Sequence, residues 1–204
     1  MANVPDKSKC FRLMCEMEML EHIVVHSITV QRVALTIADA IIACGVSLDR
    51  PLIRAAALLH DITKTRSFET REDHARTGGE YLCEQGYPEV GDAVAQHVRL
   101  SAYHRNGKPT PAEIVNYADK RVLHDRIVSM KRRMAYIVER YGDLPDLRCK
   151  LDWMWEKSIA MEQKLFRNLP FPPERIEEHL PADALASDLA AFRTVRAGYP
   201  LAPS

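Results

Sequence analysis

Six residues of this sequence have the side-chain chemistry of a metal site. They are four histidines and two aspartates: His26, His60, Asp61, His74, His97 and Asp119. Imidazole and carboxylate groups bind divalent ions when several of them converge on one point. An ionised carboxylate in an apolar interior is costly unless a cation or strong donors meet it. We therefore expect these six residues to form one site.

Helical spacing places members of this set on buried faces. His26 precedes Val30 by four residues, and Asp119 follows Val115 by four. Residues three or four apart share one face of a helix, so both side chains point inward. Taken singly, each residue has a simpler explanation: a hydrogen-bonded core histidine, a solvated first-turn histidine or a structural ion pair. Their recurrence in one small chain favours the metal site.

The elements that must position these residues are helices, because apolar residues recur three or four apart and strand-like alternation is almost absent. Thr70 to Asp73 resembles a capping box, and Thr110 to Glu113 combines a cap, a proline and a reciprocal glutamate. We expect helices over about 14–25, 26–41, 52–61, 74–85, 88–97, 111–122, 127–141 and 147–169, and a loop over 101–111. The pattern predicts an all-α fold.

The chain divides most clearly at 169–173, the proline-rich stretch LPFPP. We expect one domain over 1–169 and a C-terminal helical extension with a tail over 170–204. Basic and acidic residues balance at 28 each, so no overall positive field recruits nucleic acid. The basic run Lys131-Arg132-Arg133 is interpreted as a solvated helix face, and a nucleic-acid partner is not expected.

The N-terminus lacks the basic and then apolar pattern of a secretion signal, and no uninterrupted apolar run reaches the length of a bilayer span. We expect a cytoplasmic protein without a membrane partner. Trp153 and Trp155 diverge by about 100° around a helix, so one of them should face away from the core. That tryptophan leaves a homodimer open.

The order of the candidate ligands resembles that of a known family. His26, then His60-Asp61, then Asp119, with the stretch HDITK beside an apolar helix, is similar to the HD-domain superfamily of metal-dependent phosphohydrolases. The similarity covers about residues 21–123. Thr63 stands where a glycine is common, and Val98 follows His97 where some two-metal members have a second histidine.

The resemblance implies an HD-domain-like helical bundle with additional C-terminal helices. It also implies a ligand set. One divalent ion would be bound by His26, His60, Asp61 and Asp119, and Asp61 would bridge to a second ion held by His74 and His97. The number of ions, one or two, is left open, and the donors suit Fe, Mn, Ni, Co, Zn or Mg, with the four imidazoles favouring a transition metal.

The implied reaction is attack of metal-bound hydroxide on the phosphorus of a small phosphate ester or anhydride, for example a nucleotide. Asp61 and Lys64 are the candidate catalytic residues, because Lys64 lies one turn after the His-Asp pair and can meet a phosphate oxygen. Lys64, Arg71 and Arg105 are the candidate substrate-binding residues, since arginine binds phosphate in a bidentate manner.

Two other functions fit the same ligands. A di-iron oxygenase of the HD type would use the same six residues, and a non-catalytic module could bind metal or nucleotide without turnover. A second His-Asp pair, His124-Asp125, lacks a preceding apolar run. We interpret that pair as structural or as a neighbour of Asp119 rather than as a ligand pair.

Overall fold

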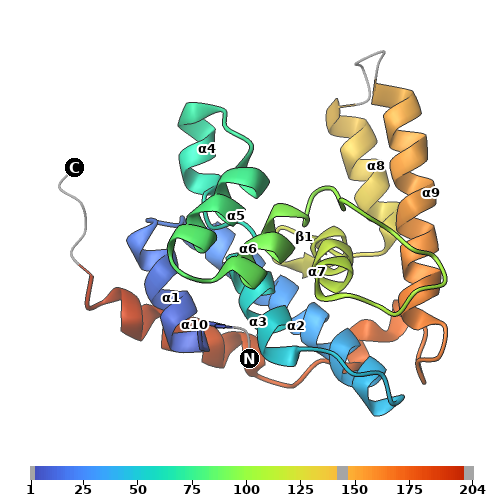
Figure 1. Ribbon diagram of the computed structural model, residues 1–204, viewed down its shortest axis with the longest axis horizontal. Helices are drawn as coiled ribbons and strands as arrows, with labels where there is room; N and C mark the ends of the chain where they lie inside the picture. Colours follow the sequence, from blue (N-terminus) through green and yellow to red (C-terminus); the bar gives the residue numbers. More distant parts are fainter. Residues whose placement is uncertain (1–2, 142–146, 200–204) are drawn as a thin grey trace.

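The computed structural model describes residues 3–141 and 147–199 (Figure 1). Within them are ten α-helices, one 3₁₀ helix and one two-stranded ribbon, which confirms the all-α prediction. The helices are α1 Lys7–Glu16, α2 Glu21–Ala43, α3 Arg50–Leu59, α4 Lys64–Thr70, α5 His74–Glu84, α6 Pro88–Ala95, α7 Pro111–Lys120, α8 Met130–Tyr141, α9 Leu147–Phe166, η1 Pro173–His179 and α10 Ala184–Arg196. The strands are β1 Val122–Leu123 and β2 Arg126–Ile127.

Helices α2 and α3 form the centre of the core. Val30, Val33 and Ile37 of α2 are fully buried at spacings of three and four residues, as an inward stripe requires. In α3, Asp49 caps the first turn by accepting a hydrogen bond from the Leu52 amide, and the helix then buries a continuous apolar run. The two helices pack on each other and on α7, and α3 also packs on α6.

Helices α5 and α6 approach each other unusually closely. A Cβ atom on Gly79 would lie 2.7 Å from the Gly91 carbonyl oxygen, and one on Gly91 would lie 2.6 Å from that of Gly79. Only glycine at both positions permits this backbone contact. Because α5 begins at His74 and α6 ends just before His97, the close packing brings these two histidines together.

The first helix differs from the expectation. A helix over 14–25 was expected, but α1 starts at Lys7 and ends at Glu16. Glu18 has a φ of 49°, in the left-handed region, and the chain turns there before α2 begins. The apolar residues on both sides of the turn are buried, so their spacing continued across a break that periodicity alone does not reveal.

The two predicted capping boxes have opposite outcomes. The Thr110 hydroxyl accepts from the Glu113 amide at 3.2 Å, and the Glu113 carboxylate accepts from the Thr110 amide at 3.0 Å, which confirms the capping box of α7. The box at Thr70 is wrong, since Thr70 ends α4 and Arg71 has a left-handed φ of 60°. Asp73 alone caps α5, by accepting from the amides of its first turn.

A short hairpin replaces the expected end of the helix after Asp119. Val122 pairs with Ile127 in an antiparallel ribbon, whereas the apolar spacing had placed Val122 on a helix. His124, in the tight turn of this hairpin, has a φ of 58°. The turn aims the His124 carbonyl oxygen at α2 and, as described below, at one of the candidate ligands.

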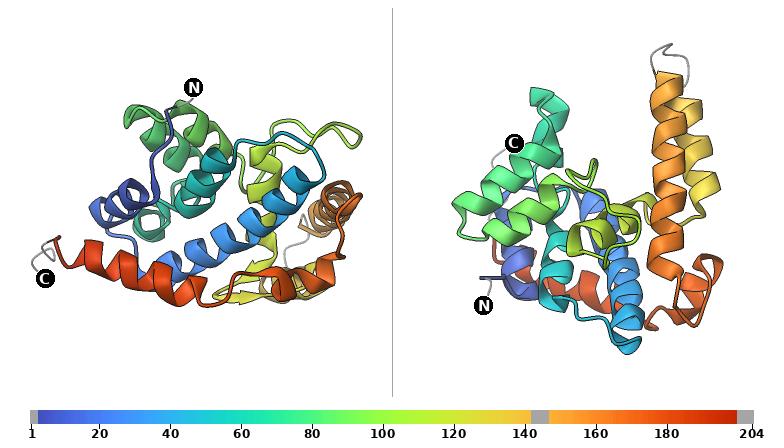
Figure 2. Two further views of the ribbon diagram at one scale, coloured as in Figure 1. Left: turned by 90° about the horizontal axis from the view of Figure 1, so that it is seen from below. Right: turned by 45° about the vertical axis from the view of Figure 1, so that its right-hand side comes forward.

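The C-terminal half surrounds this core on two sides. Helices α8 and α9 stand side by side and project from the rest of the molecule (Figure 2). On the other side, α10 packs on α1 and α2, with the rings of Phe11 and Phe192 in an edge-to-face contact at 5.7 Å. The division into 1–169 and 170–204 stays a prediction.

Helix α2 has the length and composition that crossing a membrane would require, and 61% of its most apolar window is buried inside the protein. Core helices meet the same criteria of length and composition. Its apolar stripe is already covered by α3 and α7. The cytoplasmic location stays a prediction.

Candidate metal centre

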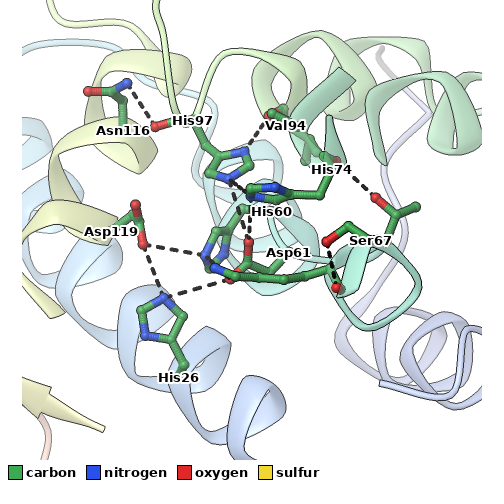
Figure 3. Close-up of polar contacts among 12 residues, drawn as sticks. His26, His60, Asp61, Ser67, His74, Val94, His97, Asn116 and Asp119 are labelled. Atoms are coloured by element: carbon green, nitrogen blue, oxygen red, sulfur yellow. Dashed lines mark hydrogen bonds and ion pairs between the residues drawn. The ribbon is translucent and has the colours of Figure 1, made fainter. Parts of the chain in front are cut away.

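The six candidate ligands converge at one place, although they come from five helices or helix ends (Figure 3). His26 lies in the second turn of α2 and Asp119 in the last turn of α7. His60 and Asp61 occupy the turn directly after α3, His74 opens α5, and His97 follows α6. The structure therefore brings together all six residues that the sequence singled out.

Hydrogen bonds from three imidazoles to backbone carbonyls fix how the rings point. The Nδ1 atoms of His26, His60 and His97 lie 2.8, 2.8 and 2.7 Å from the carbonyl oxygens of His124, Ala57 and Val94. A carbonyl only accepts, so each Nδ1 must carry the proton and donate it. In the neutral imidazole the lone pair is then on Nε2, the atom that faces the cluster, in the way that ligating histidines are usually oriented.

The two carboxylate oxygens of Asp61 face different histidines. Oδ1 lies 3.2 Å from His74 Nε2 and 3.6 Å from His97 Nε2. Oδ2 lies 3.4 Å from His60 Nε2 and 4.0 Å from His26 Nε2. Asp61 thus stands between two groups of donors.

Asp119 completes the first of these groups. Its Oδ1 atom lies 3.0 Å from His26 Nε2 and 3.6 Å from His60 Nε2. The three donors of the second group are Asp61, His74 and His97, with the Nε2 atoms of the two histidines 3.2 Å apart. In each group the donor atoms are close enough to hold one ion.

Two buried atoms of the cluster test whether these residues fit a metal. Among the residues that the structure describes, His60 Nε2 and Asp61 Oδ1 are buried and have no hydrogen-bond partner. A buried polar atom without a partner is costly. Both atoms belong to a set of imidazoles and carboxylates that suits divalent ions. A cation placed among them would satisfy both, so the residues fit one.

The electrostatics of the cluster favour a cation as well. Burial alone would raise the pKa of Asp61, but His60, His74 and His97 hold it well below its usual range. For His60, burial lowers the pKa, and the carboxylates of Asp61 and Asp119 outweigh burial and raise it to about 10. The carboxylates therefore remain ionised in the interior.

The cluster has a closed floor and an open side. The side chains of His60, Asp61 and His97 are 0%, 1% and 2% exposed, whereas those of His26, Asp119 and His74 are 12%, 15% and 24% exposed. A small ligand can therefore reach the cluster from the side on which His26, Asp119 and His74 are partly exposed.

Residues 23–122 match the family model of the HD domain, and this range contains all six candidate ligands. The chain belongs to the HD-domain superfamily. The HD domain is typical of metal-dependent hydrolases and binds divalent metal, which agrees with the two donor groups. The family resemblance drawn from the sequence is confirmed.

One curated relative of the HD-domain chain is a tRNA (cytidine(56)-2'-O)-methyltransferase from Picrophilus torridus. The two are 29% identical over an alignment of 144 residues, and the alignment covers 64% of this chain. The chain spans 40% of that relative's length. No solved structure gives a significant match.

Lys64, at the start of α4, contacts the HD pair directly. Its Nζ donates to Asp61 Oδ2 at 2.8 Å, and its side chain is 35% exposed. Burial lowers the pKa of Lys64, but Asp61 outweighs burial and raises it, so the group stays charged. Lys64 is thus placed both to hold Asp61 and to face a ligand from outside.

The other two predicted substrate-binding residues lie elsewhere. Arg71 is exposed in the turn after α4. Arg105, in the loop before α7, bonds to the Gln163 side chain at 3.3 Å. The structure shows no contact of either residue with the six ligands of the HD domain, and their role in substrate binding stays a prediction.

Several supporting residues were not foreseen from the sequence. Thr63, where a glycine is common, donates its hydroxyl to the carbonyl of His74 at 2.9 Å and so fixes the start of α5. The Asn116 amide donates to the carbonyl of His97 at 2.8 Å. His124 supports His26 through its backbone carbonyl, and its imidazole packs against Tyr136 instead.

Two cations near the HD cluster were also missed. Burial lowers the pKa of Lys120 to about 8, Asp119 acts in the opposite direction, and Arg133 lowers it further. The charge of Arg133 also lowers the pKa of Lys64. Arg133 is partly buried, and its Nε atom is buried without a hydrogen-bond partner among the described residues, so the interpretation of this residue as part of a solvated face is wrong. Its neighbours Lys131 and Arg132 are exposed as expected.

Proposed function

We propose that the protein is a metal-dependent phosphohydrolase that cleaves a phosphate ester or anhydride of a nucleotide or another small molecule. The observation that carries the proposal is the position of Asp61. Its two oxygens face two separate pairs of histidines, and each pair is completed to a group of donors that suits one ion. Paired ions on a shared carboxylate are typical of phosphate-ester hydrolysis.

The residues of each donor group have a distinct part in this proposal. One ion would be held by His26, His60 and Asp119, and the other by His74 and His97, with Asp61 shared between them. Bound divalent ions lower the pKa of a water molecule and stabilise charge on the attacking and leaving oxygens. The four imidazoles favour Fe, Mn, Co, Ni or Zn over Mg.

Lys64 would orient both the bridging carboxylate and the substrate. Its ammonium group already donates to Asp61 Oδ2, and an ammonium group has two further protons to donate. Because about a third of the side chain is exposed, these protons can reach a phosphate oxygen. Lys64 therefore supports the choice of an anionic substrate.

The methyl-transfer activity named for the Picrophilus torridus relative is not carried over to this chain. The chain spans 40% of that protein, so an activity of the whole relative need not reside in the shared part. A cluster of four imidazoles and two carboxylates is a metal-binding set. It therefore supports hydrolysis more directly than methyl transfer.

The experiment is a metal analysis of the purified protein followed by a phosphate-release assay over a panel of nucleotides and small phosphate esters. His26→Ala should lower the metal content and abolish phosphate release, because it disables one of the two donor groups. His22→Ala is the matched control, because His22 is exposed one turn earlier on the same helix and should keep both. Metal-loaded protein that releases no phosphate from the whole panel would refute the proposal. Oxygen consumption by a di-iron form, without phosphate release, would indicate the oxygenase alternative.

A further inference from the structure

A cavity of about 580 Å³ lies between the loop after α6, helix α7 and helix α9. Its size is in the range of sites for small organic ligands. Val98 and Lys120, which line it, directly follow the ligands His97 and Asp119 in the chain. Asn116, also in the lining, donates to the carbonyl of His97. Asn116 therefore links the lining of the cavity to the backbone of one candidate ligand.

The lining of this cavity is largely apolar and aromatic. The apolar and aromatic side chains are Val98, Leu100, Tyr103, Trp153, Met154 and Met161. Val98 and Trp153 are 53% and 48% exposed, although both are large hydrophobic residues. Exposed apolar surface gathered in one hollow is typical of a binding site. A flat aromatic group would cover both side chains.

The charged residues of the lining have one sign. They are Arg99, Lys120 and Lys157, and no carboxylate lies among the residues that line the cavity. Lys157 Nζ lies 3.9 Å from the centre of the Trp153 ring, and Lys120 Nζ bonds only to oxygens of Asn116 among the described residues. The cavity therefore suits a ligand that is both aromatic and anionic.

Arg133 lies on α8, which packs on α9, one of the helices that line the cavity. Its positive charge lowers the pKa of Lys120, which lines the cavity, and of Lys64, which contacts Asp61. Its Nε atom is buried and has no hydrogen-bond partner among residues 3–141 and 147–199. A guanidinium group binds phosphate oxygens through paired N–H groups, so a phosphate would satisfy this unpartnered donor.

We propose that the cavity binds the planar aromatic group of an anionic phosphate ester, such as the base of a nucleotide, while Lys120 and Arg133 bind its phosphate oxygens. The assignment rests on the proposed function for the position of the reacting phosphate. It goes further because α8 and α9 lie outside residues 23–122, so the substrate site is built partly from helices that follow the HD domain.

The test compares two probes that differ only in the aromatic base. Isothermal titration of the metal-loaded protein with adenosine 5′-monophosphate and with ribose 5-phosphate should show tighter binding of the nucleotide. Trp153→Ala should reduce the ratio of the two affinities by about tenfold, in the range of base–aromatic stacking. Val138→Ala is the matched control, since Val138 is 50% exposed on α8 and does not line the cavity. Equal affinity for the two probes would overturn the proposal.

A second pair of variants tests the phosphate contact. Arg133→Gln should weaken the binding of both probes by about tenfold, the usual size of a hydrogen bond to a charged group. Arg132→Gln, its exposed neighbour on the same helix, should leave both affinities unchanged. Equal effects of the two variants would contradict the assignment of Arg133.

The outcomes separate this inference from the proposed function. Base-dependent binding that Trp153→Ala abolishes, without phosphate release from any ester, would support the cavity and refute the hydrolase. Phosphate release without any preference for the base would support the hydrolase and refute the aromatic site in the cavity. Sedimentation of the same variants covers one further outcome. If Trp153→Ala converted a dimer to a monomer, the tryptophan would be covered by a second copy of the chain, and the aromatic site would be wrong.

Discussion

Two groups of buried charges in this molecule differ in how they are satisfied. In the first, Lys164 donates to both carboxylate oxygens of Glu113, at 2.6 and 2.7 Å, and Glu113 also caps α7. In the second, the candidate metal cluster, His60 Nε2 and Asp61 Oδ1 are buried and have no hydrogen-bond partner among the described residues. The first group is complete within the chain. A cation would supply the partners that the second group lacks, and this difference distinguishes a structural ion pair from a candidate metal site.

The largest expected effect is on the cluster, from Asp61→Ala. Because Asp61 faces both donor groups, its loss should abolish binding of both ions and all phosphate release. Metal analysis and the phosphate assay measure this, with circular dichroism to show that the helices remain. A variant that kept its metal and its full activity would place the chemistry elsewhere.

The reverse experiment breaks the structural pair with Lys164→Met. Removing one partner of a buried ion pair should lower the free energy of unfolding by about 3–5 kcal/mol, while the metal content of the folded protein stays the same. Denaturant unfolding gives the first quantity. Lys157→Met, at an exposed position on the same helix, should change it by about 0.5 kcal/mol or less. A stable Lys164→Met protein without metal would contradict the distinction between the two groups.

Chelation should destabilise the wild-type protein by a smaller amount. A ligand that binds only the folded state, at a free concentration of 100 times its Kd, stabilises it by about 2.7 kcal/mol. Removing the ions should therefore lower the melting temperature of the wild type and leave that of Asp61→Ala unchanged. Equal melting temperatures of the wild type with and without chelator would show that no ion completes the cluster.

The smallest effect is expected from Asn116→Ala. The Asn116 amide holds the carbonyls of Gln96 and His97, so its loss should let the His97 ring move without removing a donor. Support of this kind is worth about tenfold in metal affinity. Competition with a chelating dye measures it. An unchanged affinity would mean that the backbone after α6 holds His97 without help.

The convergence of the six candidate ligands could be predicted because residues such as His26 and Asp119 are tied to a local pattern. His26 and Asp119 share the face of buried valines on their helices, and such spacing survives whatever the helices pack against. Gly79 is likewise a local feature, because its lack of a side chain is what permits the close contact between α5 and α6. Each of these patterns lies within one helix or turn, and the packing of the helices brings the residues together.

The supporting residues were not predictable because their partners are distant in the chain. Glu113 and Lys164 are 51 residues apart, and neither position indicates the other. Arg133 belongs to a basic run that is typical of a solvated face, whereas in the structure it is partly buried. The hairpin at Val122 follows apolar spacing that also fits a helix, so the backbone turn at His124 decided the structure.

The most direct test of the account is the number of ions bound per chain. Purified apoprotein titrated with Mn²⁺ or Zn²⁺ should take up two equivalents, because Asp61 is placed between two donor groups. His74→Ala should take up one, since it disables only the second group, and His22→Ala should still take up two. Two ions in the wild type and one in His74→Ala would support the shared carboxylate. A single equivalent in the wild type, unchanged in His74→Ala, would contradict it.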